Sequence, residues 1–293
     1  MFAHARWLAS LRALPCYHPL RAFKGDAGVS FVERRGYEHP IDLPCARCIG
    51  CRIQRSQSWA LRVMHEAQLH PVNCFVTLTY DEASLSPGLD HRDYQLFMKR
   101  LRKRFSPSPV RYFMCGEYGE QNLRPHFHAC LFGVHFPDQK TYKKNHQDKY
   151  IYSSPTLDSL WPHGQSTVAP LNLQTAGYTA RYFFKRNTLA SDLGLPPEYG
   201  RCSTRPGIGH GWFHKFSGTD MLPGDYVVNE KGVKCPVPAY YDKLTKRSGG
   251  DLDQIKATRE LRALPHRADN TPARLSVKEA VRTAQLRTLE RKL

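Results

Sequence analysis

"VRYFMCGEYG" (110–119) and "HFHACLFGV" (126–134) are two β-rich stretches that lie on either side of a short polar connection. Their composition predicts two strands, and the connection, which ends in Pro125, predicts an antiparallel hairpin with a long loop. Pro125 holds Arg124 in an extended conformation, which fixes where the second strand begins. The hairpin therefore places the end of the first strand beside the start of the second.

The segments around this hairpin supply further strands and helices. "NCFVTLTYD" (73–81) alternates in the manner of a strand that is buried on at least one side. "DHRDYQLFMKRLRKRF" (90–105) begins with Asp90 as a helix N-cap and carries an apolar stripe, which predicts the clearest helix of the chain. Apolar residues at helical spacing also predict helices over residues 56–70 and 173–186.

The remaining stretches show weaker patterns. Residues 135–170 are aromatic and rich in Pro and Lys without a clear period, which predicts a surface insertion, and residues 190–250 are predicted to be rich in loops. Ser276 and Glu279 match a capping box, so a final helix is predicted to begin at Ser276. The chain is accordingly divided into a Cys-rich N-terminal segment (1–55), a core (56–190) and a basic C-terminal region (191–293).

The charge of the chain indicates a polyanionic partner. Among 293 residues, 43 are Lys or Arg and 26 are Asp or Glu, which gives a net charge of +17 with histidine neutral. Such a protein attracts nucleic acid through release of condensed counterions. Charge alone does not separate a specific nucleic-acid enzyme from a ribosome-associated or merely basic protein.

No stretch resembles a membrane anchor or a secretion signal. A membrane span needs about 18 or more consecutive apolar residues, and the N-terminal stretch is interrupted by Arg6 and Arg12. We therefore expect a cytosolic protein without a membrane partner. The number of cysteines, nine, is odd, which favours a metal site or free thiols over a disulfide framework.

An H-x-H pattern in the second strand of the hairpin is a candidate metal site. Side chains alternate along a strand, so His126 and His128 share a face about 6.5 to 7 Å apart, while Phe127 points to the other face. The neighbouring strand brings Glu117 beside them, with Glu120 as the alternative third ligand. Two imidazoles and a carboxylate leave open positions and favour Mg²⁺ or Mn²⁺, although zinc also accepts these ligands. An isolated H-x-H more often marks two structural histidines.

A Y-x-x-x-Y-x-x-K pattern places Tyr178, Tyr182 and Lys185 on one face of the helix over 173–186. A phenol is ionised to only about one part in a thousand at neutral pH, so a tyrosine nucleophile needs a nearby cation and an activated phosphate. The alternative is an aromatic core stripe that ends in a lysine. Phe183 and Phe184 weaken this alternative, because they offer the core a more apolar face.

Cys45, Cys48 and Cys51 form a C-x-x-C-x-x-C motif. Three thiolates at this spacing, with Cys16 or His18 as a fourth ligand, predict a structural zinc site. The alternative is a reduced, cysteine-rich turn before the first helix, because such tight spacing can strain a shared tetrahedral site.

Taken in this order, the motifs resemble the HUH-type rolling-circle replication initiators. The segments "CARCIGCR", "FVTLTYDE", "YQLFMKRLRKRF", "CGEYGEQNLRPHFHACLFG" and "YTARYFFKR" are similar to the replication initiator of microviruses of the gokushovirus group, and the similarity covers about residues 45 to 186. The tyrosines follow the histidine strand, whereas mobilisation relaxases usually place them before it. The second tyrosine favours the two-tyrosine initiators over single-tyrosine enzymes.

The resemblance implies an α+β fold, in which helices pack on a central antiparallel sheet that is ferredoxin-like in outline. It implies an enzyme that nicks circular phage DNA at the replication origin, leaves a 5′-phosphotyrosyl link and a free 3′-hydroxyl, and later rejoins the strands. The implied partners are single-stranded origin DNA and the replication helicase and polymerase of the host, in the bacterial cytoplasm. The implied site consists of the metal ligands His126, His128 and Glu117, the nucleophiles Tyr178 and Tyr182, and the phosphate-positioning Lys185.

A rival interpretation is a non-enzymatic protein that binds or packages single-stranded DNA. In that case the basic charge would attract the strand, and Tyr178, Tyr182 and Phe184 would form a stacking surface. This interpretation leaves the two histidines and Glu117 unexplained.

Overall fold

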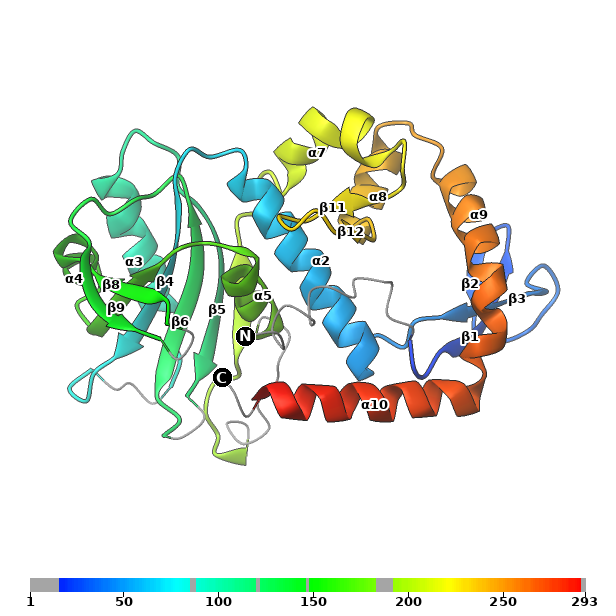
Figure 1. Ribbon diagram of the computed structural model, residues 1–293, viewed down its shortest axis with the longest axis horizontal. Coiled ribbons are helices and arrows are strands. Elements are labelled where there is room, and N and C mark those ends of the chain that lie inside the picture. The colour runs from blue at the N-terminus through cyan, green and yellow to red at the C-terminus, as the bar shows by residue number, and fades with distance from the viewer. Residues whose placement is uncertain (1–15, 85–87, 120–121, 146–147, 183–191, 291–293) are drawn as a thin grey trace. The chain divides into compact units, whose positions relative to one another are not determined.

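The computed structural model describes residues 16–84, 88–119, 122–145, 148–182 and 192–290 (Figure 1). The chain forms two compact units. The first, which we call the sheet unit, comprises Ser56–Gly224 and Pro238–Tyr241. The second, the cysteine unit, comprises Met1–Arg55, Asp225–Val237 and Asp242–Leu293. The sequence-based division at residues 55 and 190 stays a prediction.

The sheet unit is built on a seven-stranded sheet in the order β10-β5-β6-β4-β9-β8-β7. Every pair of neighbouring strands is antiparallel. The strands are β4 (Asn73–Tyr80), β5 (Arg111–Tyr118), β6 (Pro125–Phe132), β7 (Lys140–Lys144), β8 (Tyr150–Ser153), β9 (Gly164–Ala169) and β10 (Tyr199–Cys202). The predicted α+β class with a central antiparallel sheet is therefore confirmed.

Helices cover both faces of this sheet (Figure 1). On one face lie α3 (His91–Arg104) and α4 (Pro155–Leu160), and α3 begins where Asp90 accepts a hydrogen bond from the N–H of Arg92. Tyr94, Phe97 and Leu101 of α3 are fully buried with Phe127 of β6, as the apolar stripe predicts. The other face carries α5 (Leu173–Tyr182).

Helix α2 (Ile49–Ala67) also packs on this second face through its part that belongs to the sheet unit. The ring of Trp59 stacks on Phe113 of β5 at 5.1 Å between centroids. The predicted helix over 56–70 is thus present, but it begins earlier, because the cysteine motif runs directly into its first turn.

The prediction of a surface insertion over residues 135–170 is wrong. This stretch contains β9, an interior strand that pairs with both β4 and β8. It also contributes Leu157 and Trp161, which are buried in the core. The sequence of β9, "GQSTVA", buries only Ser166 and Val168, so it lacks the apolar alternation that marks a strand.

The rest of the sheet unit lies in the region predicted to be loop-rich and contains more regular structure than expected. Besides β10 it includes α7 (His210–Phe216) and a π-helical turn (Ser217–Met221). Short elements of this kind carry too few periodic residues to be recognised in the sequence.

The cysteine unit contains a three-stranded antiparallel sheet in the order β2-β1-β3 and a two-stranded ribbon, β11-β12. Its final helix begins at Pro272, so Ser276 lies inside the helix and the capping box does not mark its start. The elements are β1 (Leu20–Gly25), β2 (Gly28–Ser30), β3 (His39–Leu43), β11 (Val227–Val228), β12 (Lys234–Cys235), α8 (Ala239–Arg247, which begins in the sheet unit), α9 (Leu252–Ala263), a 3₁₀ helix (Leu264–Asn270) and α10 (Pro272–Glu290).

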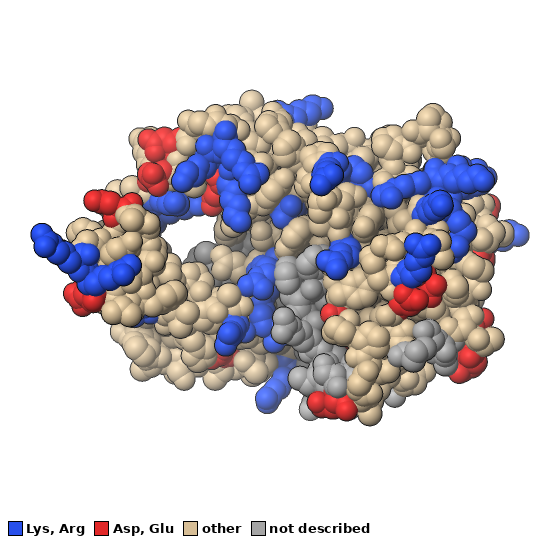
Figure 2. All heavy atoms as spheres, turned by 180° about the vertical axis from the view of Figure 1, so that it is seen from behind, with Lys and Arg blue, Asp and Glu red and all other residues tan. Residues whose placement is uncertain are grey.

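Positive charge is widespread on the surface. Figure 2 shows Lys and Arg side chains distributed over the face in view, interspersed with acidic groups. Within the part of the chain that the structure describes, no helix has the length and apolar character needed to cross a membrane.

Candidate metal centre and tyrosine nucleophile

The register of the β5–β6 hairpin brings the predicted acidic and histidine residues together. Glu117 lies directly opposite His126, and Cys115 lies opposite His128. Because side chains alternate along β6, both imidazoles project from the face that α5 covers, while Phe127 is buried on the other side. The predicted hairpin and the shared face of the two histidines are confirmed.

Helix α5 delivers a tyrosine to the same place. Asn172 caps the helix, since its Oδ1 accepts hydrogen bonds from the N–H groups of Gln174 and Thr175. Ala176 and Ala180 are fully buried, and their small side chains allow α5 to lie close to the sheet. Tyr178 therefore reaches the end of β5.

Three side chains converge on one carboxylate oxygen. The Nε2 atoms of His126 and His128 each lie 2.9 Å from Oε1 of Glu117, and the hydroxyl of Tyr178 donates a hydrogen bond to the same oxygen, also at 2.9 Å. The ring of Tyr178 meets that of His128 edge-on, with centroids 4.9 Å apart. The second oxygen of Glu117, Oε2, is buried without a hydrogen-bond partner.

The far sides of both imidazoles are held by other groups. Nδ1 of His126 lies 3.0 Å from the carbonyl oxygen of Arg124, and Nδ1 of His128 lies 3.0 Å from Oγ1 of Thr77. A carbonyl only accepts hydrogen bonds, so Nδ1 of His126 carries the proton. In its neutral form, His126 then directs the lone pair of Nε2 at a carboxylate oxygen, and two such atoms at 2.9 Å need a proton or a cation between them.

The electrostatics of the site suit a cation. Burial raises the pKa of Glu117, but hydrogen bonds with His126 and His128 lower it further, to about 2. The carboxylate is therefore ionised at neutral pH. Burial also lowers the pKa of His128, which favours the neutral imidazole that binds a metal. The ligand atoms of the three residues lie within 4.8 Å of one another, close enough for one ion to reach all of them.

Comparison with known proteins places this site in a family. The model of the replication-associated protein ORF2 family matches residues 73–187, which contain all the groups just described. The chain is 30% identical over 246 residues to the replication-associated protein VP4 of Bdellovibrio phage phiMH2K, covering 80% of this chain and 78% of that protein. The chain belongs to the replication-associated proteins of microviruses.

Two other members of the family show the same relationship. The replication-associated protein ORF2 of Spiroplasma virus 4 is 32% identical over 235 residues, covering 74% of this chain and 73% of that protein. Replication-associated protein ORF4 of Chlamydia phage 1 is 27% identical over 216 residues, covering 70% of this chain and 54% of that protein. No solved structure matches the chain. The predicted resemblance to a microvirus replication protein is confirmed.

The structure describes part of the site predicted for this replication-associated protein. Glu117, His126, His128 and Tyr178 lie together. Tyr182 is the last residue of α5, and the position of its side chain lies outside what the structure describes. Lys185 and the alternative ligand Glu120 also lie outside the described residues.

Three residues at the site of this replication-associated protein were not predicted. Thr77 lies opposite His128 in the β4–β6 register, and it shares a strand face with Phe75 and Thr79 in the sequence pattern. The guanidinium of Arg124 binds the carbonyl of Tyr80 and pairs with Glu82, so the backbone that holds His126 is itself fixed. The guanidinium of Arg181 lies 5.9 Å from the ring centre of Tyr178, a proximity that their i, i+3 spacing could have indicated.

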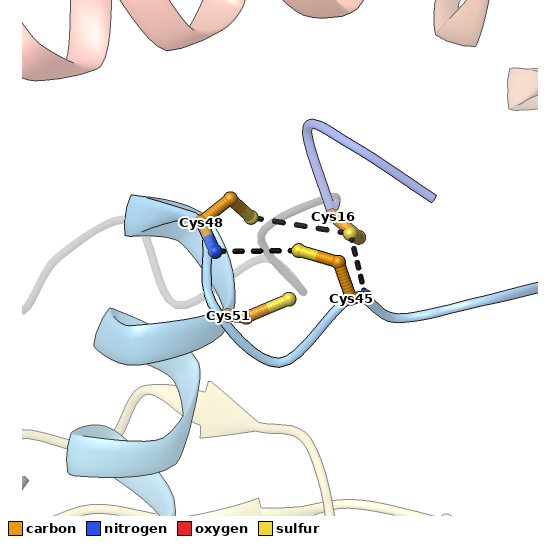
Figure 3. Close-up of side chains that lie close together, drawn as sticks. All are labelled: Cys16, Cys45, Cys48 and Cys51. Atoms are coloured by element: carbon orange, nitrogen blue, oxygen red, sulfur yellow. Dashed lines mark hydrogen bonds between the residues drawn. The ribbon is translucent and has the colours of Figure 1, made fainter. Parts of the chain in front are cut away.

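In the cysteine unit, the predicted zinc ligands form a second group. Cys16, Cys45, Cys48 and Cys51, which we call the cysteine cluster, have sulfur atoms within 4.8 Å of one another (Figure 3). The other suggested fourth ligand, His18, instead lies 2.7 Å from Glu279 through its Nε2.

The thiols of the cysteine cluster differ in acidity. Burial raises the pKa of Cys45, but N–H groups of Cys48 and Arg47 and the thiols of Cys16 and Cys48 lower it to about 6. Burial and the hydrogen bonds with Cys16 and Cys48 raise the pKa of Cys51. All four cysteines are free of disulfides.

Proposed function

We propose that this protein initiates rolling-circle replication by nicking single-stranded or supercoiled circular phage DNA at the origin. In this proposal a tyrosine attacks a phosphodiester, forms a 5′-phosphotyrosyl bond and releases a free 3′-hydroxyl, and the strands are rejoined after synthesis. The observation that carries the proposal is the convergence of the Tyr178 hydroxyl and two imidazoles on Oε1 of Glu117. The membership of a replication-associated family supports it.

The proposed cofactor is Mg²⁺ or Mn²⁺, held by Glu117, His126 and His128. Two imidazoles and one carboxylate leave open positions, and the carboxylate oxygen favours these hard ions. The buried, unpartnered Oε2 of Glu117 and the facing lone pairs at Oε1 fit a bound cation. When bound, the ion would supply Lewis acidity toward a phosphate oxygen.

Within this site, Glu117 orients the nucleophile and does not act as a strong base. The pKa of Glu117 is about 2, whereas an ordinary phenol has a pKa of about 10, so transfer of the phenol proton to the carboxylate is strongly unfavourable. The hydrogen bond from Tyr178 instead holds its oxygen beside the ligand atoms. In the proposed step, this oxygen bonds to phosphorus while the bond from phosphorus to the 3′ oxygen breaks, and that oxygen takes up a proton.

Labelling of the DNA at either end tests the proposal. Single-stranded oligonucleotides that tile the cognate phage genome are incubated with the full-length protein and Mn²⁺, and the products are separated under denaturing conditions. A label at the 3′ end should move to a protein adduct, whereas a label at the 5′ end should appear on a shorter, free fragment that a polymerase can extend. Salt-sensitive binding without an adduct from any oligonucleotide would instead support a non-enzymatic single-stranded DNA-binding or packaging protein.

Thr77 should tune the metal affinity without touching the ion. Thr77→Val keeps the shape of the side chain but removes the oxygen beside Nδ1 of His128, which orients the imidazole. Loss of such a partner typically weakens metal binding by about 10- to 100-fold. Manganese titration followed by electron paramagnetic resonance measures the change, and Thr79→Val is the matched control. Equal affinities in the two variants would contradict this role of Thr77.

The β7–β8 hairpin is the proposed contact for single-stranded DNA. Tyr142 and Tyr150 are about half exposed (48% and 49%), and the ammonium groups of Lys143 and Lys144 lie 5.3 and 5.0 Å from their ring centres. Exposed rings flanked by cations match the way proteins stack and neutralise single strands. Lys149, in the turn of the hairpin, bonds to Gln174 of α5, the helix that carries Tyr178.

Charge reversal on β7 should weaken DNA binding more than it weakens chemistry. Lys140→Glu with Lys143→Glu should lower the affinity for single-stranded DNA, and the slope of log affinity against log salt should become shallower by about 0.7 for each lost phosphate contact. At saturating oligonucleotide the adduct should still form. Lys243→Glu with Lys246→Glu on α8 changes the net charge equally and serves as the control. An identical loss in both double variants would contradict a specific role of the hairpin.

The remaining partners follow from the proposed mode of replication. A free 3′-hydroxyl serves as primer for a host polymerase, and strand displacement calls for a host helicase. Both would act in the cytoplasm of the bacterial host.

A further inference from the structure

The cysteine cluster has the dimensions of a metal site. Its sulfur atoms lie within 4.8 Å of one another, and those of Cys16 and Cys48 are 3.9 Å apart. Four sulfurs at about 2.3 Å from a tetrahedral zinc ion stand about 3.8 Å from each other. A disulfide would need about 2.05 Å. In Figure 3 the side chains of the segment before β1 and of the start of α2 point toward a common centre.

Backbone N–H groups are directed at the sulfur atoms. The N–H groups of Arg47 and Cys48 donate to Sγ of Cys45 at 3.4 and 3.3 Å, and that of Cys45 donates to Sγ of Cys16 at 3.1 Å. The N–H of Tyr17 donates to Sγ of Cys48 at 3.3 Å. A neutral thiol is a weak acceptor, so four such bonds indicate negatively charged sulfur.

The backbone answers the objection that the spacing is too tight for one ion. Ala46 adopts a left-handed conformation with φ of 61°, which turns the chain back between Cys45 and Cys48. Cys51 lies in the first turn of α2, three residues after Cys48, so both thiols lie on the same side of the helix start. A left-handed alanine costs roughly 1 to 2 kcal/mol, which the surrounding structure must offset.

We propose that Cys16, Cys45, Cys48 and Cys51 bind one structural zinc ion. Four thiolates fill a tetrahedral site and leave no open position for substrate, which distinguishes a structural from a catalytic zinc. Soft thiolates also exclude Mg²⁺, the hard ion favoured by the Glu117 site. The chain would thus sort two kinds of metal by ligand chemistry alone.

The zinc ion joins three distant segments of the cysteine unit. Leu275 of α10 is buried against Tyr17, Cys48 and Cys51, and His18 pairs with Glu279 one turn further along α10. These few side chains form a small apolar cluster, which supplies little burial energy by itself. A structural zinc adds its binding free energy directly to folding, and it would hold α10 to the segment before β1 and to the start of α2.

Elemental analysis of the full-length protein tests the proposal. Protein expressed with sufficient zinc and purified without chelator should contain one zinc per chain. Cys48→Ser should lose it, whereas Cys235→Ser should keep it, because Cys235 is buried in β12 of the same unit but outside the cluster. His128→Ala should also keep its zinc, so loss of the nicking site and loss of this site are distinguishable. Equal zinc in wild type and Cys48→Ser, or wild type with less than half an equivalent, would overturn the proposal.

Cobalt exchange keeps the test decisive if Cys48→Ser fails to fold. Wild-type protein in which Co²⁺ replaces zinc should show intense thiolate-to-cobalt absorption and the visible bands of a tetrahedral ion. Absence of these bands would overturn the assignment. Chelator-treated wild type should also become sensitive to proteases within residues 272–290, and addition of zinc should restore protection. Unchanged proteolysis after complete zinc removal would refute the role of the ion in holding α10.

Discussion

Tyr178→Phe combined with Tyr182→Phe should abolish the covalent adduct with an origin oligonucleotide. Each single variant should still form an adduct, because two rounds of cleavage in rolling-circle replication need two phenols. Residues i and i+4 stand about 6 Å apart along a helix axis, so either tyrosine can approach a phosphate at the same site. The contact between Tyr178 and Glu117 shows that α5 delivers its first tyrosine to the ligand atoms.

Strand transfer separates this alternating scheme from a scheme with one nucleophile. Transfer between two oligonucleotides should need both tyrosines, whereas simple cleavage should need only one. The circular dichroism spectrum of each variant controls for folding, because removal of a hydroxyl changes no apolar packing. The alternating scheme is wrong if Tyr178→Phe is inactive while Tyr182→Phe equals wild type in cleavage and in transfer. Tyr182 would then be a residue that packs or positions the phosphate.

His128→Ala should lower the cleavage rate by at least about 10²- to 10³-fold, the loss typical when one preorganised electrostatic group is removed from an active site. His128 is buried, and its Nε2 is one of the two imidazole nitrogens at Glu117. Binding of DNA should persist with its usual salt dependence, since Lys and Arg elsewhere supply the phosphate contacts. The rate of adduct formation and the salt dependence of affinity are measured on the same preparations.

A matched control and a metal readout make this prediction specific. His214→Ala removes an exposed histidine of α7 and should leave cleavage unchanged. Manganese binding, followed by electron paramagnetic resonance, should be lost in His128→Ala and retained in His214→Ala. Cleavage by wild type at an undiminished rate after thorough chelation would rule out the metal-dependent mechanism.

The sequence predicted those parts of the site that depend on local geometry. Glu117 and His126 are nine residues apart and belong to one hairpin, so strand alternation and antiparallel pairing are enough to bring them together. The same reasoning placed Phe127 in the core. The helix with Tyr178 was also predicted from its period, but its position over β5 and β6 was not, because the packing of a helix on a sheet depends on residues distant in sequence.

Contacts between remote segments account for what the sequence did not reveal. Cys16 lies 29 residues before Cys45, and nothing in a spacing of that length distinguishes it from His18 as the fourth ligand. Thr77 meets His128 only because β4 and β6 are neighbours in the sheet. Strand β9 was missed because its burial comes from its interior place in the sheet and not from an apolar pattern.

Phe127 gives the two histidines around it an unusual rigidity. Its ring is completely buried and lies within 5.4 to 6.1 Å of the rings of Tyr94, Trp161 and Tyr80. A residue locked on one side of a strand cannot twist without moving its neighbours, so His126 and His128 lose their freedom when the protein folds and not when an ion arrives. Loading the site should therefore leave the amide hydrogen-exchange pattern of β6 almost unchanged. Different divalent ions could then replace one another between catalytic cycles without any refolding of the enzyme.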